Sequence, residues 1–402
     1  IHHESIKELP KWIEQMKNTM DFWPIAYYPY FMRKLSNGLS VEDIHDLDEV
    51  EADWEYIREL TIKENANGFP MFMGYEWQGS GMDGDHNVFF KYNDGLMKYP
   101  LRYNELVNEY NNEDVIGIPH HVAYQLGYRG KNWDTHNDDF SPFVETYSSH
   151  GSSENDTNPI SMSRHIHMGP RTSNTAAEEG YNRGYKYGLI ASGDNHSTPG
   201  VFGFGYCAVM AYSASKDDIW DAFVNRRVYG VSKEKIKLWY TIDDTNMGSS
   251  IIESTESMLE VKIEGSNAID RIEIIKDNIV TDMIPHTSTW ETEKLEGVIK
   301  FKFHLELGWG PDRRTFEDIE SKKWHGKVYT PGKIISIEKC WSNFGQSLNE
   351  IDEHSCEFSL KTFKTTASGK WMGPSAVTTE GFIFEIEDDI NSSIMLNIDE
   401  SI

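Results

Sequence analysis

The sequence changes character near residue 232, and this change constrains the fold more than any other feature. Before it, short apolar runs alternate with segments of helical periodicity, as an α/β fold with parallel strands requires. The runs expected to form strands cover residues 22–27, 71–76, 87–91, 115–120, 142–147 and 188–193. Capping boxes at Ser5 and Ser40 predict the starts of two helices, because they satisfy free backbone N–H groups.

After residue 232 the helical periodicity ends. Strand-like runs separated by turn residues cover residues 236–242, 258–263, 271–275, 298–305, 334–338, 358–363 and 382–386. This pattern predicts an antiparallel β-sandwich. We therefore expect an α/β domain over residues 1–232 and a β-sandwich domain over residues 233–402 packed against it, which suits a chain of 402 residues.

The charge balance excludes some classes of partner. The chain has 38 Lys and Arg against 65 Asp and Glu, a formal net charge of −27. Because nucleic acids and anionic membranes attract basic surfaces, we expect neither as a partner. No apolar run approaches the ~20 residues that span a bilayer. A small-molecule substrate is the expected partner, and the oligomeric state stays open.

The three cysteines, Cys207, Cys340 and Cys356, are widely spaced and odd in number. They fit neither a disulfide scaffold nor a zinc ribbon, so we expect free thiols in a reducing compartment. No signal peptide is visible, which favours a cytoplasmic location. The chain opens at Ile1 rather than Met, so that location stays an open expectation.

Imidazoles and carboxylates gather where the expected strands of the first region end. Eleven of the 15 histidines lie before residue 200. The residues at four separate strand ends are Glu76, His120, Glu145 with His150, and Asp194 with His196. Because the carboxyl ends of parallel strands meet on one face, we expect these side chains to share a site.

Neutral imidazole and carboxylate oxygen are the ligands that Zn²⁺, Mn²⁺ or Fe²⁺ take in proteins. A metal ion held in this way lowers the pKa of bound water to about 7 and supplies a nucleophile at neutral pH. The pattern therefore predicts a metal-dependent hydrolase. A single buried histidine is usually just paired in a local hydrogen bond, and this alternative stays open for each residue taken alone.

At these residues the chain resembles the PHP superfamily, named for polymerase and histidinol phosphatase domains. It is most similar to a branch of unknown function in which a PHP-like barrel precedes a β-domain. The matching segments begin at Gly74, Gly84, Ile118, Val144, Met168 and Ala191, and continue at Arg226 and Asp243. The resemblance implies a distorted PHP-like (β/α)7 barrel followed by an antiparallel β-sandwich, and amidohydrolase-like chemistry on a phosphoester.

The resemblance also implies metal ligands. The metal-bridging carboxylate of the family falls on Glu76, its strand-end histidine on His120, a further ligand on His150, and its terminal Asp-x-His pair on Asp194 and His196.

The sequence departs from the family pattern in two places. The family opens with a His-x-His strand, whereas this chain begins Ile1-His2-His3-Glu4 directly before a helix. The second family strand ends in Asp-His, whereas here Tyr27-Tyr28 stands. We therefore expect one or two divalent ions, Zn or Mn with Fe as a further option, rather than three.

A second tier of residues is expected to contact the substrate or assist catalysis. His86 follows a Gly-rich loop and is a candidate general acid or, equally, a loop cap. His121 would point away from His120 on an extended strand, toward substrate. Arg164 and Arg171 would hold an anionic oxygen. His45 and His136 lie among acidic residues and are expected at the surface.

Together these observations predict a metal-dependent hydrolase of the PHP or amidohydrolase type. It would act on a phosphoester or related polar small molecule through a metal-bound hydroxide. The alternative is a non-catalytic binding protein on a degenerate PHP-like scaffold, which the missing His-x-His motif and Tyr27-Tyr28 would explain.

Overall fold

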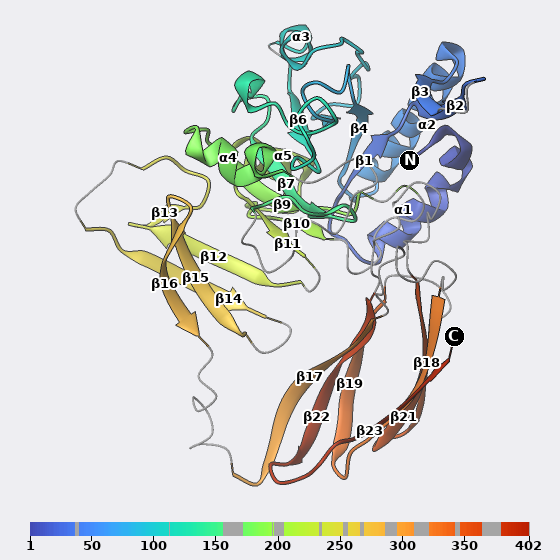
Figure 1. The fold of residues 1–402 in the computed structure, drawn as a ribbon, viewed down its shortest axis with the longest axis vertical. Coiled ribbons are helices and arrows are strands. Elements are labelled where there is room, and N and C mark those ends of the chain that lie inside the picture. The colour runs from blue at the N-terminus through green and yellow to red at the C-terminus, as the bar shows by residue number, and fades with distance from the viewer. Residues whose placement is uncertain are drawn as a thin grey trace.

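The computed structural model describes residues 1–36, 40–111, 113–155, 172–194, 196, 205–232, 235–251, 256–265, 269–285, 296–308, 321–341, 346–363 and 379–401. It is a mixed α/β structure with many small sheets and few helices (Figure 1). The helices all lie in the first region, and the chain after residue 232 forms strands only within the described segments. No helix among the described residues combines the length and apolar character needed to cross a membrane.

The first sheet has the strand order β1-β4-β5-β6. Its strands are β1 (Trp23–Tyr27), β4 (Met71–Trp77), β5 (His86–Phe90) and β6 (Val115–Pro119). β1 and β4 pair in parallel, as expected. β5 pairs antiparallel to both β4 and β6, so the prediction of uniformly parallel strands is wrong there. The loop between β4 and β5 is too short for the crossover that a parallel pair needs.

The second sheet has the order β8-β7-β9, with β7 (Phe143–Ser148), β8 (Gly151–Ser152) and β9 (Gly188–Ala191). β7 and β9 are parallel. β10 (Tyr206–Val209) and β11 (Val228–Val231) form an antiparallel pair joined through α5 (Lys216–Val224). Within the described part of the chain these strands stay in separate sheets and close no barrel, so the (β/α)7 barrel remains a prediction.

Helices α1 and α2 pack against the first sheet. A 3-10 helix η1 (His3–Glu8) leads into α1 (Leu9–Lys17), and α2 (Leu47–Ala66) lies between β1 and β4 in the chain. Shorter helices are α3 (Tyr103–Glu109), α4 (Ala177–Asn182), η2 (Trp133–Thr135) and η4 (Ser173–Thr175). Leu9, Ile13 and Ile57 pack into the core beneath β1 and β4.

The prediction that α2 starts at Ser40 is wrong, because a β-strand comes before the helix. Ser40 lies in β3 (Ser40–Ile44), which pairs with β2 (Tyr30–Lys34). The helix begins only at Leu47, where the carboxylate of Asp46 accepts a hydrogen bond from the backbone N–H of Asp48 at 3.0 Å. Asp and Ser are both good N-caps, and the strand pairing of residues 40–44 leaves the role to Asp46.

The second region is antiparallel throughout its described strands. Two small sheets come first, built from β12 (Lys237–Ile242), β13 (Thr245–Asn246), β14 (Leu259–Glu264), β15 (Arg271–Lys276) and β16 (Ile279–Pro285). Two larger sheets follow, built from β17 (Val298–Gly308), β18 (Ser321–Tyr329), β19 (Lys333–Cys340), β20 (Ser347–Asp352), β21 (Ser355–Phe363), β22 (Thr379–Asp389) and β23 (Met395–Ser401).

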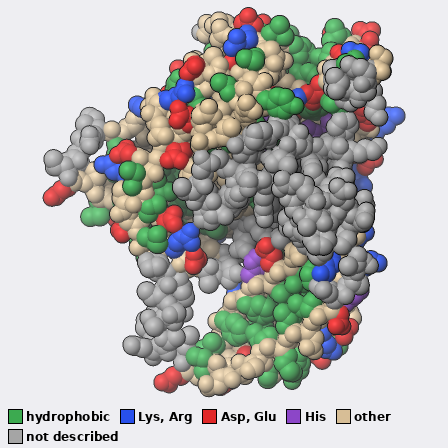
Figure 2. All heavy atoms as spheres, in the orientation of Figure 1, with side chains coloured by type: hydrophobic (Ala, Val, Ile, Leu, Met, Phe, Trp, Pro, Cys, Tyr) green, Lys and Arg blue, Asp and Glu red, His purple; other side chains and the backbone are tan. Residues whose placement is uncertain are grey.

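The two larger sheets share one hydrophobic core, with Leu360 on β21 facing Phe382 and Phe384 on β22. The sandwich is therefore built from β17 to β23, whereas β12 to β16 contribute nothing to that core. In Figure 2 hydrophobic side chains gather over the sheet formed by β17, β22 and β19. The domain boundary at residues 232 and 233 itself stays a prediction.

Candidate metal centre

Three ligand atoms from two separate parts of the chain lie close enough to hold one cation. One atom each from His120, His121 and Asp194 lies within 4.8 Å of the other two. His120 and His121 follow β6 directly, and Asp194 follows β9. The two histidines are only 1% and 3% exposed, so packing holds both imidazoles in place, whereas Asp194 is half-buried.

The other expected ligands extend this group on both sides. Oε1 of Glu76 lies 3.7 Å from Nε2 of His120. The two carboxylate oxygens of Asp194 lie 3.1 Å from Nε2 of His150 and 3.2 Å from Nε2 of His196. We call Glu76, His120, His121, His150, Asp194 and His196 the rim cluster. The structure thus brings all five of the residues expected as ligands together, along with His121.

The side chain of His121 does not point away from His120 as an extended strand would require. The two ring centroids are only 4.1 Å apart. β6 ends at Pro119, and His121 has a φ of 37°, in the left-handed region that non-glycine residues seldom adopt. The alternation of side chains therefore stops before His121, and the backbone turns both imidazoles to the same side.

His2 joins the rim cluster through His196. Nε2 of His2 lies 2.7 Å from Nδ1 of His196, and the ring of His2 lies 4.6 Å from that of Tyr28. A parallel bridge joins His2 to Tyr28, at the end of β1. Burial, and then the neighbouring His196, lowers the pKa of His2 to about 3. The adjacent His2-His3 pair was the available signal, but no spacing in the sequence connects it to residue 196.

Two further buried carboxylates border the cluster: Asp85 was not expected at the site, and Glu145 was expected there but not as a metal ligand. Asp85, which is fully buried, accepts a hydrogen bond from Arg129 at 2.6 Å, and its Oδ2 lies 3.6 Å from Nε2 of His121. Burial, and then the charges of Glu76 and Asp194, raises the pKa of Asp85 well above its usual value. The segment Gly84-Asp85-His86 carries the sequence signal for Asp85, but of its residues only His86 was expected at the site.

Glu145 on β7 is the second of these carboxylates. Its Oε1 accepts a hydrogen bond from the backbone N–H of His121 at 3.3 Å, and its other oxygen accepts one from Ser192. Burial, and then the charge of Asp194, raises the pKa of Glu145 to about 7. The strand-end position of Glu145 was visible in the sequence, but His150 in the same segment was preferred as the ligand.

The residues fit a divalent metal ion on two observations. Nδ1 of His120 and Oδ1 of Asp85 are buried without a hydrogen-bond partner among the described residues, which is costly for polar atoms. In addition, Glu76, Asp85, Glu145 and Asp194 crowd together. A cation between them would offset both the desolvation and the mutual repulsion. Imidazole and carboxylate donors without thiolate suit zinc, manganese or iron.

The second-tier residues have other surroundings. Nδ1 of His86 lies 3.0 Å from the carbonyl oxygen of Gly84, and Nε2 lies 3.1 Å from Nζ of Lys131. The ring stacks on Tyr103 at 4.5 Å. Both nitrogens of His86 therefore contact groups outside the rim cluster. Arg164 and Arg171 lie outside the described residues.

Arg129 is the cation that the structure places beside the cluster. Besides Asp85, its guanidinium donates to Oε1 of Gln78 at 3.2 Å and pairs with Glu42. Gln78 in turn donates to Oε1 of Glu76 at 3.0 Å and to the hydroxyl of Tyr28 at 3.0 Å. This network connects the end of β1 with the end of β4, and it orients the Glu76 carboxylate.

The tyrosine pair at the end of β1 divides between two surroundings. Tyr28 faces the rim cluster, with its ring 5.2 Å from that of His196. Tyr27 faces the other way and donates its hydroxyl to Oδ2 of Asp53 at 2.8 Å. Only Tyr28 therefore stands where a further ligand of the cluster could have been.

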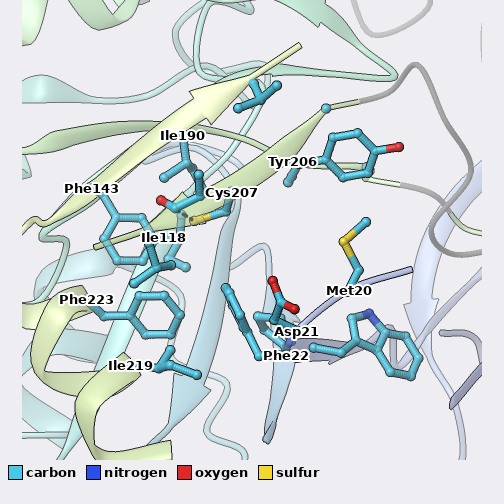
Figure 3. A pocket seen from close by; sticks show the side chains of 18 of the residues that line it. Met20, Asp21, Phe22, Ile118, Phe143, Ile190, Tyr206, Cys207, Ile219 and Phe223 are labelled. Atoms are coloured by element: carbon cyan, nitrogen blue, oxygen red, sulfur yellow. Dashed lines mark hydrogen bonds between the residues drawn. The ribbon is translucent and has the colours of Figure 1, made fainter. Parts of the chain in front are cut away.

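A cavity of about 890 Å³ opens beside the cluster. Glu76, Asp194 and His196 line part of it. Most of the other lining side chains are apolar, among them Phe22, Ile118, Phe143, Ile190 and Phe223, which Figure 3 shows around the open space, and a few, such as Asp21 and Arg227, are charged. A molecule in this cavity would meet polar groups on one side and hydrocarbon on the other.

No family model matches the chain, and no curated protein matches it. Among solved structures it is similar to a two-domain protein from Bacteroides vulgatus containing a predicted PHP-like metal-dependent phosphoesterase. The sequence identity is 11% and the TM-score 0.32, over 90% of this chain and 77% of the other. Similarity at this level assigns neither a fold nor an activity to the chain.

Proposed function

We propose that the protein is a metal-dependent hydrolase of a phosphoester or a related polar small molecule. The observation that carries this proposal is the convergence of His120, His121 and Asp194 within 4.8 Å, buried among further carboxylates. The proposed cofactor is one or two ions of zinc or manganese, with iron as a further option. Such an ion supplies Lewis acidity and makes water a nucleophile near neutral pH.

The residues around the ligands would hold them in one orientation. The hydroxyl of Tyr124 lies 2.8 Å from Nδ1 of His150, so it fixes the ring with Nε2 toward Asp194. Asp85 lies against Nε2 of His121, and Gln78 holds Glu76. Outer contacts of this kind fix the tautomer and direction of a ligand and raise its basicity.

The substrate would lie in the cavity beside the cluster, with its reacting group toward Glu76, Asp194 and His196. Glu145 also lines this cavity, and its carboxylate would exchange a proton with the substrate or with water there. Arg164 and Arg171 keep their proposed role of holding an anionic oxygen.

The alternative proposal is a binding protein without catalysis. The observation that favours it is Tyr28, whose ring stands beside His2 and His196 at the end of β1. In that case the rim cluster would bind a metal ion or a polar ligand and no turnover would follow.

Elemental analysis of protein purified without chelator, followed by assays on a panel of phosphoesters and amides, separates the two proposals. The hydrolase requires bound metal and turnover that falls on chelation and returns with zinc or manganese. Bound metal without turnover across the panel supports the binding protein. Absence of both metal and metal-stimulated turnover would overturn the hydrolase.

A further inference from the structure

A second group of metal-ligating side chains lies on the other side of the β1 end. One ligand atom each from His3, His45 and Glu49 lies within 4.8 Å of the other two. His3 begins η1, His45 follows β3, and Glu49 lies in the first turn of α2. The start of the chain therefore meets the segment that joins β3 to α2 at one point.

This group is separate from the rim cluster, although His2 and His3 are neighbours in the chain. His2 points to His196, whereas Nδ1 of His3 lies 2.7 Å from Oδ2 of Asp53 on α2. Tyr28 and Tyr27 divide in the same way, toward His196 and toward Asp53. The end of β1 thus stands between the two groups.

The contact with Asp53 prepares His3 to act as a ligand. Asp53 is 7% exposed and its Oδ2 also accepts the hydroxyl of Tyr27, so the carboxylate is held in place. A carboxylate on Nδ1 of an imidazole fixes the proton there and leaves the lone pair of Nε2 for a metal. This arrangement of carboxylate, histidine and open ring nitrogen is typical of zinc ligands.

The second imidazole carries a buried nitrogen without a protein partner. Nε2 of His45 has no hydrogen-bond partner among the described residues, and the closest carboxylate oxygen, on Glu4, is 3.7 Å away. The His45 side chain is 13% exposed, so the expectation that it lies at the surface is wrong. Its ring is packed between those of His3 and Phe31, each with a centroid 4.8 Å away.

The acidic side chains around the pair supply charge for a dication. Glu49 is exposed and Glu4 largely so. The hydrogen bond from His3 to Asp53, and the charges of Asp53, Glu49 and Glu4, raise the pKa of His3. Two imidazoles with one or two carboxylate oxygens and a position open to water are a common ligand set for a divalent transition metal.

We propose that His3, His45 and Glu49 bind a divalent transition-metal ion of the zinc class, independent of the rim cluster. The ion would join η1 to the segment between β3 and α2. It would thereby hold His2, the residue next to His3, against His196. The role is structural, because the group faces away from the cavity beside the rim cluster.

Metal stoichiometry of the full chain tests this proposal without reference to activity. A double variant, His120→Ala with Asp194→Asn, removes ligands from the rim cluster only. We expect it to retain one equivalent of Zn²⁺ after dialysis, and to give the visible absorption of Co²⁺ when titrated with that ion. Adding His45→Ala should remove both the bound zinc and the cobalt absorption.

Glu49→Gln guards against a variant that fails to fold, because Glu49 is exposed and its replacement should leave the fold intact. It should weaken Co²⁺ binding by about tenfold or more. Glu51→Gln is the matched control, with the same charge change on an exposed residue of the same helix. Zinc that survives when His45→Ala is added to the rim-cluster double variant, or a folded double variant that binds no metal, would overturn the proposal and leave the proposed hydrolase untouched.

Discussion

Asp83 and Asp85 stand two residues apart in one loop, both almost completely buried, yet their surroundings act on them in opposite directions. Asp83 accepts two hydrogen bonds from Arg102, at 2.8 and 3.1 Å, and another from the backbone N–H of Tyr103. Burial alone would raise its pKa, but these donors outweigh that effect and lower it to about 2.

Asp85 faces the rim cluster instead. Its Oδ1 has no hydrogen-bond partner among the described residues, and burial together with Glu76 and Asp194 raises its pKa. Of these two aspartates in one loop, Asp83 thus has hydrogen-bond donors and a cation for its carboxylate, whereas Asp85 has an oxygen without a donor and lies beside like charges. The difference teaches that the carboxylates at the rim are held there against their own electrostatics, as expected of groups kept for a cation.

The largest expected effect comes from a ligand of the rim cluster. On the proposed function, Asp194→Asn should lower metal affinity and turnover by more than about 100-fold, since even residues that only orient a ligand are worth 10–100-fold. Isothermal titration with Zn²⁺ and the phosphoester assay measure this. Asp83→Asn is the control, and an equal loss in that variant would show that the contrast between the two sides is wrong.

The next effect concerns stability in metal-free protein. The pKa of Glu145 is raised to about 7 by burial and then by Asp194, so the folded state holds a proton that the unfolded state releases. Stability should therefore fall between about pH 4.5 and pH 7, by on the order of 3 kcal/mol. Glu145→Gln should flatten this dependence. Urea unfolding at pH 5 and pH 8 after chelation measures the change in unfolding free energy with pH. The same change in the wild type and in Glu145→Gln would refute the expectation.

A smaller effect is expected at Asp85 itself. Asp85→Asn removes the carboxylate that lies 3.6 Å from Nε2 of His121 without removing a ligand. Metal affinity should fall by about tenfold to 100-fold, as for other residues that orient a ligand. Competition with a coloured chelator would measure the affinity. If the variant bound metal as tightly as the wild type, Asp85 would be a mere partner of Arg129.

The sequence was sufficient to place polar residues at or near the ends of buried strands, and insufficient for contacts that depend on a turn or on later segments of the chain. Glu76, His120 and Asp194 could be predicted because a polar residue directly after an apolar run marks the end of a buried strand. His121 was expected at the site, but the turn of its side chain toward His120 could not be predicted, because its φ of 37° depends on the turn that follows β6. Asp85 could not, because its partners Arg129 and His121 come from later in the chain.

The burial of some histidines also could not be predicted from the sequence. His136 has acidic neighbours in the sequence and was expected at the surface. It is 8% exposed, with its ring against Trp133 and Tyr187. Charge near a residue in the chain says little about its surroundings when aromatic side chains from another segment cover it.

The antiparallel direction of β5, in contrast, follows from the short loop between β4 and β5, and the length of that loop can be read from the sequence.

The smallest expected effect is at Asp83, and it sharpens the comparison from the satisfied side. Asp83→Asn weakens the ion pair with Arg102 and should cost about 1–2 kcal/mol at pH 7, because the half-exposed Arg102 side chain is screened by solvent. The folded-state pKa is depressed, so this contribution is present above about pH 4 and is lost as the pH falls toward 2. Urea unfolding at pH 7 and pH 3 measures the difference in unfolding free energy between the wild type and Asp83→Asn, which should be smaller at pH 3. Metal affinity should stay at the wild-type value, since none of the donors to Asp83 belongs to the rim cluster. A fall in metal affinity would show that Asp83 and Asp85 both support the metal site.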